Sequence, residues 1–391
     1  MNTLIVILLL IIFGYLTFNV AYLLLLAIAG AVGSADDKQP AAQTPSFRKM
    51  VVLIPAYKED AVIIDSVAKH LQQEYPPACV DLVVIADSLQ PHTLAKLAEF
   101  PVRIVEVVFA VSTVTKALNA ALADLPDDVY DLVVVADSDN HFAPDFLSRV
   151  NTAFGQGWRA VQGHRVAKNL NTKVAVLDAI SEEINNHLFR KGYRALNLSA
   201  SIIGSGMAIE FGLMKAAMMN LVTVGGFDKE LEMKLAIDGH RVGYLEQAYV
   251  YDEKVAKRAV FESQRTRWIA AQWQFLHHYF RQGLTDLLAG RLLSASKTLQ
   301  AMVLPRVLLL GVLGLCFLVS LLSGRPSLML GAGGLLLGLC VALLMAIPPY
   351  LRRQLAFRDL FLVLVLMLSF ARAVFNIRKA FKSFMHTPHS T

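Results

Sequence analysis

Two carboxylates one residue apart, Asp137 and Asp139, directly follow the apolar run Val133–Ala136. Two ionised carboxylates at this spacing repel each other unless a cation lies between them or one of them is protonated. In an extended or turning backbone, residues i and i+2 can point the same way. Their oxygens can then share one Mg²⁺ or Mn²⁺, which keeps open positions for phosphate oxygens. The pair predicts either a divalent-metal site that holds a phosphorylated substrate or a solvated turn.

Other polar residues stand at similar places in the chain. Asp87 ends the run VVIAD, where a carboxylate can bond to a base or a ribose, or can cap a turn. Lys116 begins a segment with helical spacing, where its ammonium can meet phosphate oxygens or lie on the surface. Ligands of parallel α/β sheets bind beyond the carboxyl ends of the strands. Because Tyr57, Asp87 and Asp137 all fall at such ends, we expect them to lie near one another.

The region that must position these residues extends from about residue 50 to 251. Short apolar runs end in Asp, Pro or Gly, and they include MVVLIPAY, DLVVIADS, VRIVEVV, DLVVVADSD and RAVQGHR. Segments with helical spacing lie between them at Glu59–Glu74, Lys116–Leu122 and Pro144–Phe154. Alternating strands and helices predict an α/β fold with a mostly parallel sheet.

The composition adds membrane segments to this picture. Of the 391 residues 55% are hydrophobic, and the mean hydropathy is +0.49. Leu4–Val32 is almost continuously apolar and no Lys or Arg precedes it, so we expect an uncleaved membrane anchor rather than a signal peptide. Two further spans are predicted at Met302–Leu322 and Leu328–Tyr350. A shorter apolar segment, Leu360–Phe370, predicts either a third C-terminal span or a re-entrant segment followed by a cytoplasmic tail.

The charge distribution predicts the orientation. The net charge is +6, with basic residues after the first span and after the last clear span, at Lys38, Arg48, Lys49, Arg352 and Arg353. The positive-inside rule therefore places the central region in the cytoplasm, next to membrane lipids. A segment rich in aromatic residues at 261–298 is typical of helices that lie in the membrane interface. Nothing in the chain favours a nucleic-acid partner.

The ordered set LIPAYKED, VVIADS, KALN, VVVADSD, GSGM, GGFDKELEMKLAIDGHRVGY and QRTRW resembles the membrane-embedded family-2 glycosyltransferases, relatives of cellulose, chitin-oligosaccharide and hyaluronan synthases. The resemblance implies a nucleotide-sugar-binding domain of the GT-A type, inserted between transmembrane helices. It divides the chain into an anchor (1–33), a cytoplasmic catalytic domain (48–258), a QxxRW segment with interfacial helices (259–300) and a C-terminal transmembrane region (301–391).

The resemblance also implies roles for single residues. Asp87 is expected to contact the nucleotide, and Lys116 its phosphates. Asp137 and Asp139 match the Asp-x-Asp motif, with Asp139 as the direct ligand of Mg²⁺ or Mn²⁺. The QxxRW motif is matched by Gln264, Arg267 and Trp268, which are expected to close over the diphosphate and the acceptor end.

The general base is expected at Asp228. The family has Thr-Glu-Asp at this place, and the pattern here aligns with Asp228 as the Asp and with Phe227 in place of the Glu. A different alignment of the motif places the general base at Glu230 or Glu232 instead. Glu182 and Glu183, on a predicted helix, are expected to face solvent.

These inferences together predict an inverting hexosyl- or N-acetylhexosaminyltransferase in the cell membrane (the inner or plasma membrane). It is expected to move a sugar from a nucleoside-diphosphate donor, such as a UDP-sugar, to a growing glycan, either processively with export or by single transfers. Three or four spans are few for a channel, so export predicts a partner protein or a homo-oligomer. The alternatives are transfer to a polyprenyl-phosphate lipid, a non-catalytic membrane scaffold and a phosphohydrolase.

Overall fold

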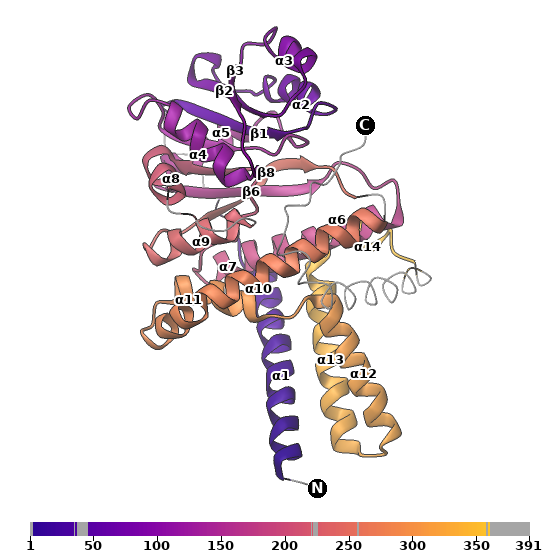
Figure 1. The fold of residues 1–391 in the computed structure, drawn as a ribbon. Coiled ribbons are helices and arrows are strands. Elements are labelled where there is room, and N and C mark those ends of the chain that lie inside the picture. The colour runs from indigo at the N-terminus through magenta and orange to yellow at the C-terminus, as the bar shows by residue number, and fades with distance from the viewer. Residues whose placement is uncertain are drawn as a thin grey trace.

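The computed structural model describes residues 3–34, 36, 46–219, 221, 226–255, 258–356 and 359. An α/β domain occupies one end of the molecule, and long apolar helices extend from the other end (Figure 1). These apolar helices are α1 (Thr3–Val32), α12 (Arg306–Leu322) and α13 (Pro326–Ala346). Two helices, α10 (Arg258–Leu288) and α11 (Leu292–Met302), lie between the domain and the apolar helices (Figure 1).

The α/β domain is built on an eight-stranded sheet with the order β3-β2-β1-β4-β7-β6-β8-β5. Its strands are β1 (Met50–Tyr57), β2 (Val80–Asp87), β3 (Arg103–Val107), β4 (Leu132–Val135), β5 (His141–Phe142), β6 (Ala160–Ala167), β7 (Met207–Glu210) and β8 (Gly243–Asp252). β1 to β4 are parallel, and so are β6 and β8, whereas β7 and β5 run antiparallel to their neighbours. The predicted α/β class is confirmed, and the two antiparallel strands make the sheet mixed.

Helices cover both faces of the sheet because its central strands are apolar on both sides. Val51 and Leu53 of β1 pack in one core with α4, α8 and α9. Val52 and Ile54 pack in a second core with α2, α3 and α5. This alternation follows from the two-residue period of a strand and is typical of buried parallel strands. The helices involved are α2 (Ile63–His70), α3 (Pro91–Leu97), α4 (Val114–Asp124), α5 (Phe146–Gly155), α8 (Phe211–Met218) and α9 (Phe227–Ile237), and a short 3₁₀ turn, η2 (Pro77–Cys79), precedes β2.

The three helical segments predicted in this domain are present as α2, α4 and α5, and α2 is shorter than predicted. After His70 the chain leaves the helix, and the backbone N–H of Glu74 donates to the carbonyl of Pro144, 2.7 Å away. This tertiary hydrogen bond replaces the helical one, so the helical pattern in the sequence extends beyond the helix itself.

The helix α6 (Lys173–Asn185) continues into the π-helical turn η3 (Asn186–Gly192) and the short α7 (Tyr193–Ala195). The prediction that Glu182 and Glu183 face solvent is wrong, since they are only 4% and 7% exposed. Glu182 pairs with Arg165 (2.8 Å) and Arg190 (3.1 Å). The polar face of α6 is covered by β6 and by the helix bundle below it, so its charges are paired inside the protein.

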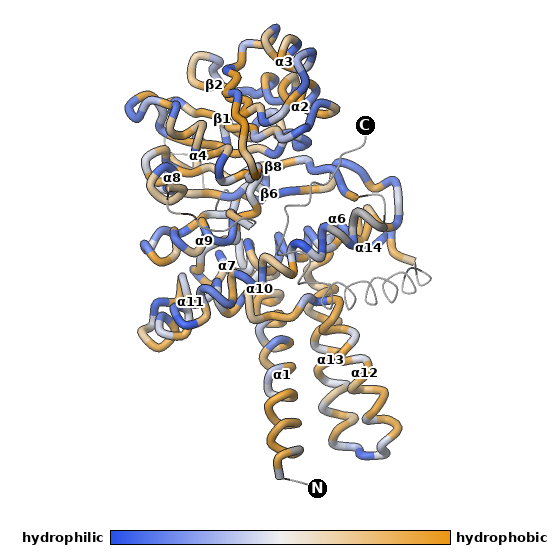
Figure 2. The backbone as a smooth tube through the Cα atoms, in the orientation of Figure 1, coloured by the Kyte–Doolittle hydropathy of each residue, from blue (hydrophilic) through white to orange (hydrophobic). Residues whose placement is uncertain are grey.

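The apolar helices α1 and α13 run side by side in the same direction. A Cβ atom added to Gly331 would contact Phe13, and one added to Gly338 would contact Val20. Both helices are long and apolar enough to cross a membrane, and the bent pair α11–α12 gives a third candidate (57° between its halves). Most residues along these helices are hydrophobic (Figure 2).

The span predicted at Leu328–Tyr350 ends earlier, at Ala346, because Pro348 and Pro349 cannot continue the helix. The chain restarts as α14 (Pro349–Arg352). The segment predicted at Leu360–Phe370 lies outside the described residues.

The last turns of α1 are buried inside the protein. Leu23, Leu26 and Ala27 are buried against η3 and the neighbouring helices. A Cβ atom at Gly192 would come within 2.5 Å of the Leu26 carbonyl oxygen, so only glycine permits this close crossing. The tight contact fixes α1 to the α/β domain.

Candidate active site

The carboxyl ends of three strands form one edge of the sheet, which we call the carboxyl edge. These ends are Tyr57 of β1, Asp87 of β2 and Val135 of β4. Tyr57 and Asp87 are direct partners in the register of β1 and β2. The residue after each has a positive φ, 57° at Lys58 and 59° at Ser88, so both chains turn sharply here. Non-glycine residues in this conformation are uncommon and cluster at functional sites. This register confirms that the ends of β1 and β2 meet, while Asp137 follows the end of β4, which pairs with β1 at Leu53 and Val135.

Asp87 is held rigidly at the carboxyl edge. Its side chain is 2% exposed, and its Oδ1 accepts a hydrogen bond from the hydroxyl of Ser88 at 2.9 Å. A hydroxyl donor orients the carboxylate without cancelling its charge. The carboxylate can therefore still accept hydrogen bonds from a ligand hydroxyl or N–H group.

The Asp137–Asp139 segment is fixed by a serine from a distant turn. The backbone N–H of Asp137 donates to Ser205 Oγ at 3.0 Å, and the amide of Asn140 lies 2.7 Å from the same oxygen. With Asn140 oriented to accept from Ser205, its Nδ2 donates to Asp139 Oδ1 (3.2 Å) and to Asp252 Oδ1 (3.0 Å). One amide thus joins the buried carboxylate of Asp139 to the end of β8.

These residues fit a divalent cation in the chemistry of their donors. Asp137 and Asp139 offer hard carboxylate oxygens on one turn, and Asp139 is only 7% exposed. No group of three or more His, Cys, Asp or Glu side chains forms a complete metal cage within the described residues. The pair therefore suits a cation that takes its remaining ligands from a substrate diphosphate and water.

The turn that carries Ser205 also reaches Asp228. Gly204 and Gly206 have φ values of 80° and 67°, which a residue with a side chain rarely adopts. A Cβ atom at Gly204 would lie 4.0 Å from the Cβ of Asp228 and 3.5 Å from the ring of Phe227. The first turn of α9 therefore packs on the glycine turn that positions Asp137, and the structure brings Asp228 to the same region.

Burial raises the pKa of the Asp228 carboxyl above its ordinary value. The two alternative bases have other contacts. Glu232 pairs with Lys297 at 2.5 Å and accepts from the backbone N–H of Ile202. Glu230 is 1% exposed and accepts a long hydrogen bond from Tyr279. Glu230 therefore contacts α10, and Glu232 contacts α11.

Lys116 lies in the first turn of α4, as predicted. Its backbone N–H donates to the capping Thr113 hydroxyl, and its ammonium donates to the carbonyl of Val111 at 2.8 Å. These contacts hold the side chain against its own loop. The structure thus places Lys116 at a helix N-terminus without a described contact to the carboxylates of the edge.

The three residues of the QxxRW motif lie on α10, beside α6. Trp268 is 38% exposed. Its ring stacks against the guanidinium of Arg265, 4.1 Å from the ring centroid. Burial lowers the pKa of the Arg267 guanidinium, and Gln264 Oε1 is buried without a hydrogen-bond donor among the described residues.

Arg265 is a residue that the sequence reasoning missed. It is buried and forms an ion pair with Asp178 of α6. One turn further along α6, Glu182 pairs with Arg165, and the same guanidinium is 3.8 Å from Asp252 Oδ2. Charged contacts therefore connect the QxxRW helix to the end of β8. No sequence signal pointed to Arg265, because it occupies an unspecified x position of the QxxRW motif.

Comparison with known proteins decides the family. The sequence model of "Glycosyltransferase like family 2" matches residues 48–271, which is more than half of the chain. The chain belongs to this glycosyltransferase family. A search of curated proteins found no match to its sequence.

A solved structure with a TM-score above 0.5 shows that the glycosyltransferase has a GT-A-like fold. The mannosyltransferase PcManGT from Pyrobaculum calidifontis, in complex with GDP-Man and Mn²⁺, is 16% identical with a TM-score of 0.58, over 93% of this chain and 97% of that one. Glucosyl-3-phosphoglycerate synthase from Mycobacterium tuberculosis is 17% identical with a TM-score of 0.40, over 58% and 80% of the two chains. TarS from S. aureus, in complex with UDP-GlcNAc, is 13% identical with a TM-score of 0.42, over 85% and 90%.

Proposed function

We propose that the glycosyltransferase moves a sugar from a nucleoside-diphosphate donor to a glycan acceptor at a membrane surface, with inversion at the anomeric carbon. The observations that support the proposal are that, in a family-2 domain, Asp87 ends β2, the Asp137–Asp139 turn follows β4, and the first turn of α9 with Asp228 packs on the glycine turn that holds Asp137. The mannosyltransferase that shares the fold was solved with a nucleotide sugar and Mn²⁺, which supports the donor class and the metal.

In the proposed reaction, Asp228 takes the proton of an acceptor hydroxyl, as a general base. The hydroxyl oxygen bonds to the anomeric carbon while the bond from that carbon to the diphosphate oxygen breaks, and its electron pair leaves with the nucleoside diphosphate. Asp87 binds the nucleoside, and Arg267 supplies positive charge near the departing diphosphate. Asp137 and Asp139 would hold Mg²⁺ or Mn²⁺, which neutralises diphosphate charge when bound.

We propose that the protein is a multi-pass protein of the cell membrane with a cytoplasmic catalytic domain. The N-terminal end of α1 and the turn between α12 and α13 lie at the far end of the molecule (Figure 1). Arg48 and Lys49 directly precede β1, and Arg352 and Arg353 lie at the end of α14, and both elements are on the side of the α/β domain (Figure 1). This arrangement agrees with the positive-inside rule.

Transfer of a single sugar to a lipid acceptor such as a polyprenyl phosphate is the second candidate. Two or at most three candidate spans are present in the described residues, fewer than a polymer channel within one chain requires. The QRTRW sequence favours chain extension instead. Analysis of the product, polymer in the aqueous phase or single sugar in the lipid extract, separates the two.

The test of the proposed function uses purified protein in lipid nanodiscs with Mn²⁺ or Mg²⁺ and a panel of hexosyl and N-acetylhexosaminyl nucleotide sugars. Release of nucleoside diphosphate with one donor, abolished in Asp139→Ala, is the expected result. If no donor gives turnover above that of Asp139→Ala, the protein is a scaffold rather than an enzyme. The donor that reacts identifies the sugar.

A further inference from the structure

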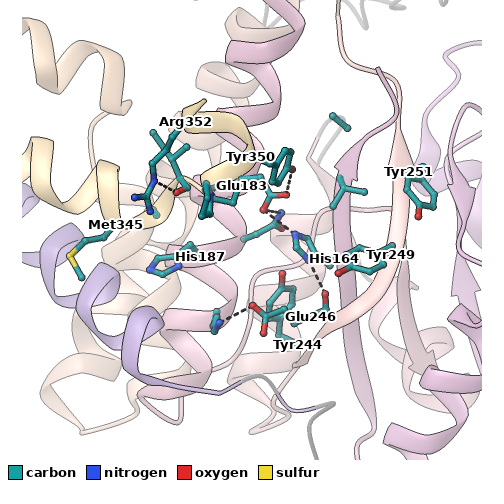
Figure 3. Close-up of a pocket in the computed structure, with 18 residues that line it drawn as sticks. His164, Glu183, His187, Tyr244, Glu246, Tyr249, Tyr251, Met345, Tyr350 and Arg352 are labelled. Atoms are coloured by element: carbon teal, nitrogen blue, oxygen red, sulfur yellow. Dashed lines mark hydrogen bonds and ion pairs between the residues drawn. The ribbon is translucent and has the colours of Figure 1, made fainter. Parts of the chain in front are cut away.

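A cavity of about 470 Å³ lies where β6, β8 and η3 meet the end of α13 and α14 (Figure 3). Its volume falls within the roughly 300–1,000 Å³ typical of small-molecule sites. Met345, Ile347 and Pro348 form the wall nearest the membrane helices. Because α13 is a candidate span that ends at Ala346, the cavity lies at the level of the membrane surface.

β6 and α6 separate the cavity from the candidate active site. Two successive residues of β6, His164 and Arg165, pair with two successive acids of α6, Glu183 and Glu182. The His164–Glu183 pair (3.0 Å) lines the cavity. The Arg165–Glu182 pair faces Asp252 on the active-site side, as the alternation of side chains along a strand requires.

Two of the basic residues in the cavity wall, Lys191 and His164, are paired with carboxylates of the same wall. Lys191 pairs with Glu246 at 2.8 Å. His164 bonds to Glu183, and although burial alone would lower the pKa of His164, this carboxylate raises it. Arg352 donates through Nε to the carbonyl of Ile347 at 2.6 Å. A phosphate site needs converging cations that lack carboxylate partners, and His164 and Lys191 are each paired with a carboxylate, so a neutral ligand fits better.

Four tyrosines line the cavity beside its charged residues. Its lining includes Tyr244, Tyr249, Tyr251 and Tyr350. The rings of Tyr249 and Tyr251 are 38% and 39% exposed, and their centroids are 6.5 Å apart with 31° between the planes. Tyr350 donates to Glu183 at 3.0 Å, which fixes that carboxylate.

This combination matches the chemistry of a pyranose ring. A sugar presents an apolar C–H face, which packs on an aromatic ring, and hydroxyl groups that donate to carboxylates and accept from tyrosine hydroxyls. The cavity offers both kinds of surface, with Glu183 and Glu246 beside the tyrosine rings (Figure 3).

We propose that the cavity is a second carbohydrate site, which binds a neutral pyranose of a glycan, either free or attached to a membrane lipid. The inference goes beyond the proposed function, because binding here requires neither the donor nor catalysis. A site of this kind holds a glycan at the membrane surface beside the transfer site.

The test measures glycan binding to the full chain carrying Asp139→Ala, which prevents turnover, in nanodiscs of zwitterionic phospholipid. Detergents with sugar headgroups must be excluded because they would compete. Neutral cello-, chito- and manno-oligosaccharides are titrated in one arm, with saturation-transfer NMR as the measurement. In the other arm, a glycolipid with the same sugar is incorporated into the nanodisc.

We expect saturable binding in at least one arm, with affinity about 10-fold weaker in Tyr249→Ala and Tyr251→Ala and nearly unchanged in Tyr249→Phe, which keeps the ring. Phe47→Ala, which removes an exposed aromatic residue outside the cavity, is the matched control. Thermal unfolding verifies that each variant is folded.

Absence of saturable glycan binding in both arms would overturn the proposal, as would equal binding by wild type and both Tyr→Ala variants. Tyrosine-dependent binding of anionic phosphatidylglycerol without neutral glycan binding would also overturn it, in favour of a phospholipid site. Nucleoside diphosphate release by the wild-type chain is measured separately, so failure of the second site is distinguishable from failure of the proposed function.

Discussion

The carboxyl edge and the junction between β6 and α6 both contain buried acids, yet they hold them differently. At the carboxyl edge, Asp87 accepts a hydrogen bond from the hydroxyl of Ser88, and Asp139 accepts one from the neutral amide of Asn140. At the junction, Glu182 forms ion pairs with the guanidinium groups of Arg165 and Arg190. Neutral donors fix the orientation of a carboxylate but keep its charge, whereas guanidinium groups neutralise it. The first arrangement suits ligand binding and the second suits a stable junction.

The pKa shifts follow the same division. Burial would raise the pKa of Glu182, but Arg165 and Arg190 hold it well below its ordinary value. Burial raises the pKa of Asp228, and the nearby Lys229 offsets this only in part. The ionised form of Glu182 therefore stabilises the fold at neutral pH, and this contribution is lost as the pH falls. The ionised form of Asp228 destabilises the fold, so its contribution to stability decreases as the pH rises.

Asp139→Ala is expected to have the largest effect on activity, a loss of about 10³-fold in kcat, because it removes a metal ligand and the charge stabilisation of the leaving diphosphate. Nucleoside diphosphate release is the measurement. Asp127→Ala, at an exposed carboxylate paired with Lys215, is the control and should retain full activity. Equal activity in the two variants would remove the distinction between the edge and an ordinary surface acid.

Glu182→Ala tests the junction through stability. Removing one partner from a buried network leaves charged groups uncompensated, so the free energy of unfolding should fall by about 3 kcal/mol. Glu210→Ala breaks an exposed pair with Arg159, and a change below about 1 kcal/mol is expected there. Thermal or denaturant unfolding in nanodiscs compares the two. Similar losses would mean that the junction is no more important to stability than the surface.

The carboxyl edge could be predicted from the sequence, and the junction could not, for a physical reason. Strand ends are visible because an apolar run stops at a polar residue, and the predicted run MVVLIPAY coincides with β1. The ion pairs of α6 join residues of different elements, such as Glu182 with Arg165 of β6, and Asp178 with Arg265 of α10, which is 87 positions away. A helix period shows which residues share a face, but it does not show which cation from another element covers that face. Glu182 and Glu183 were therefore predicted as solvent-exposed.

The position of the base was also beyond the sequence pattern alone. The motif offered three acids on α9, and only the packed fold shows that Glu232 has a dedicated cation in Lys297. The serine that fixes Asp137 comes from residue 205, in a turn whose glycines were visible but whose partner was not.

Asp228→Asn is expected to reduce kcat by about 10²-fold or more, because the amide cannot accept the acceptor proton. It should also raise the melting temperature at neutral pH, since it removes a carboxylate whose ionisation opposes folding. Activity of the wild type should fall as the pH decreases through the raised pKa of Asp228. Glu230→Gln is the matched variant, and it should retain activity. If Glu230→Gln loses activity and Asp228→Asn retains it, Glu230 is the base, and the motif aligns with the sequence in a different register.

Asp87→Ala is expected to have the smallest of these effects on catalysis, because Asp87 is assigned to nucleoside binding rather than to bond breaking. The KM for the donor should rise about 10-fold with little change in kcat, as for lost binding that is equal in the ground and transition states. The control lies on the same strand: Asp81 is at the opposite end of β2, where its carboxylate pairs with Lys49 at 2.7 Å. Asp81→Ala should leave the donor KM within about twofold of wild type, because ligands of such sheets bind beyond the carboxyl ends only. If both variants raise KM equally, the effect comes from a general disturbance of β2, and the donor does not bind at the carboxyl edge.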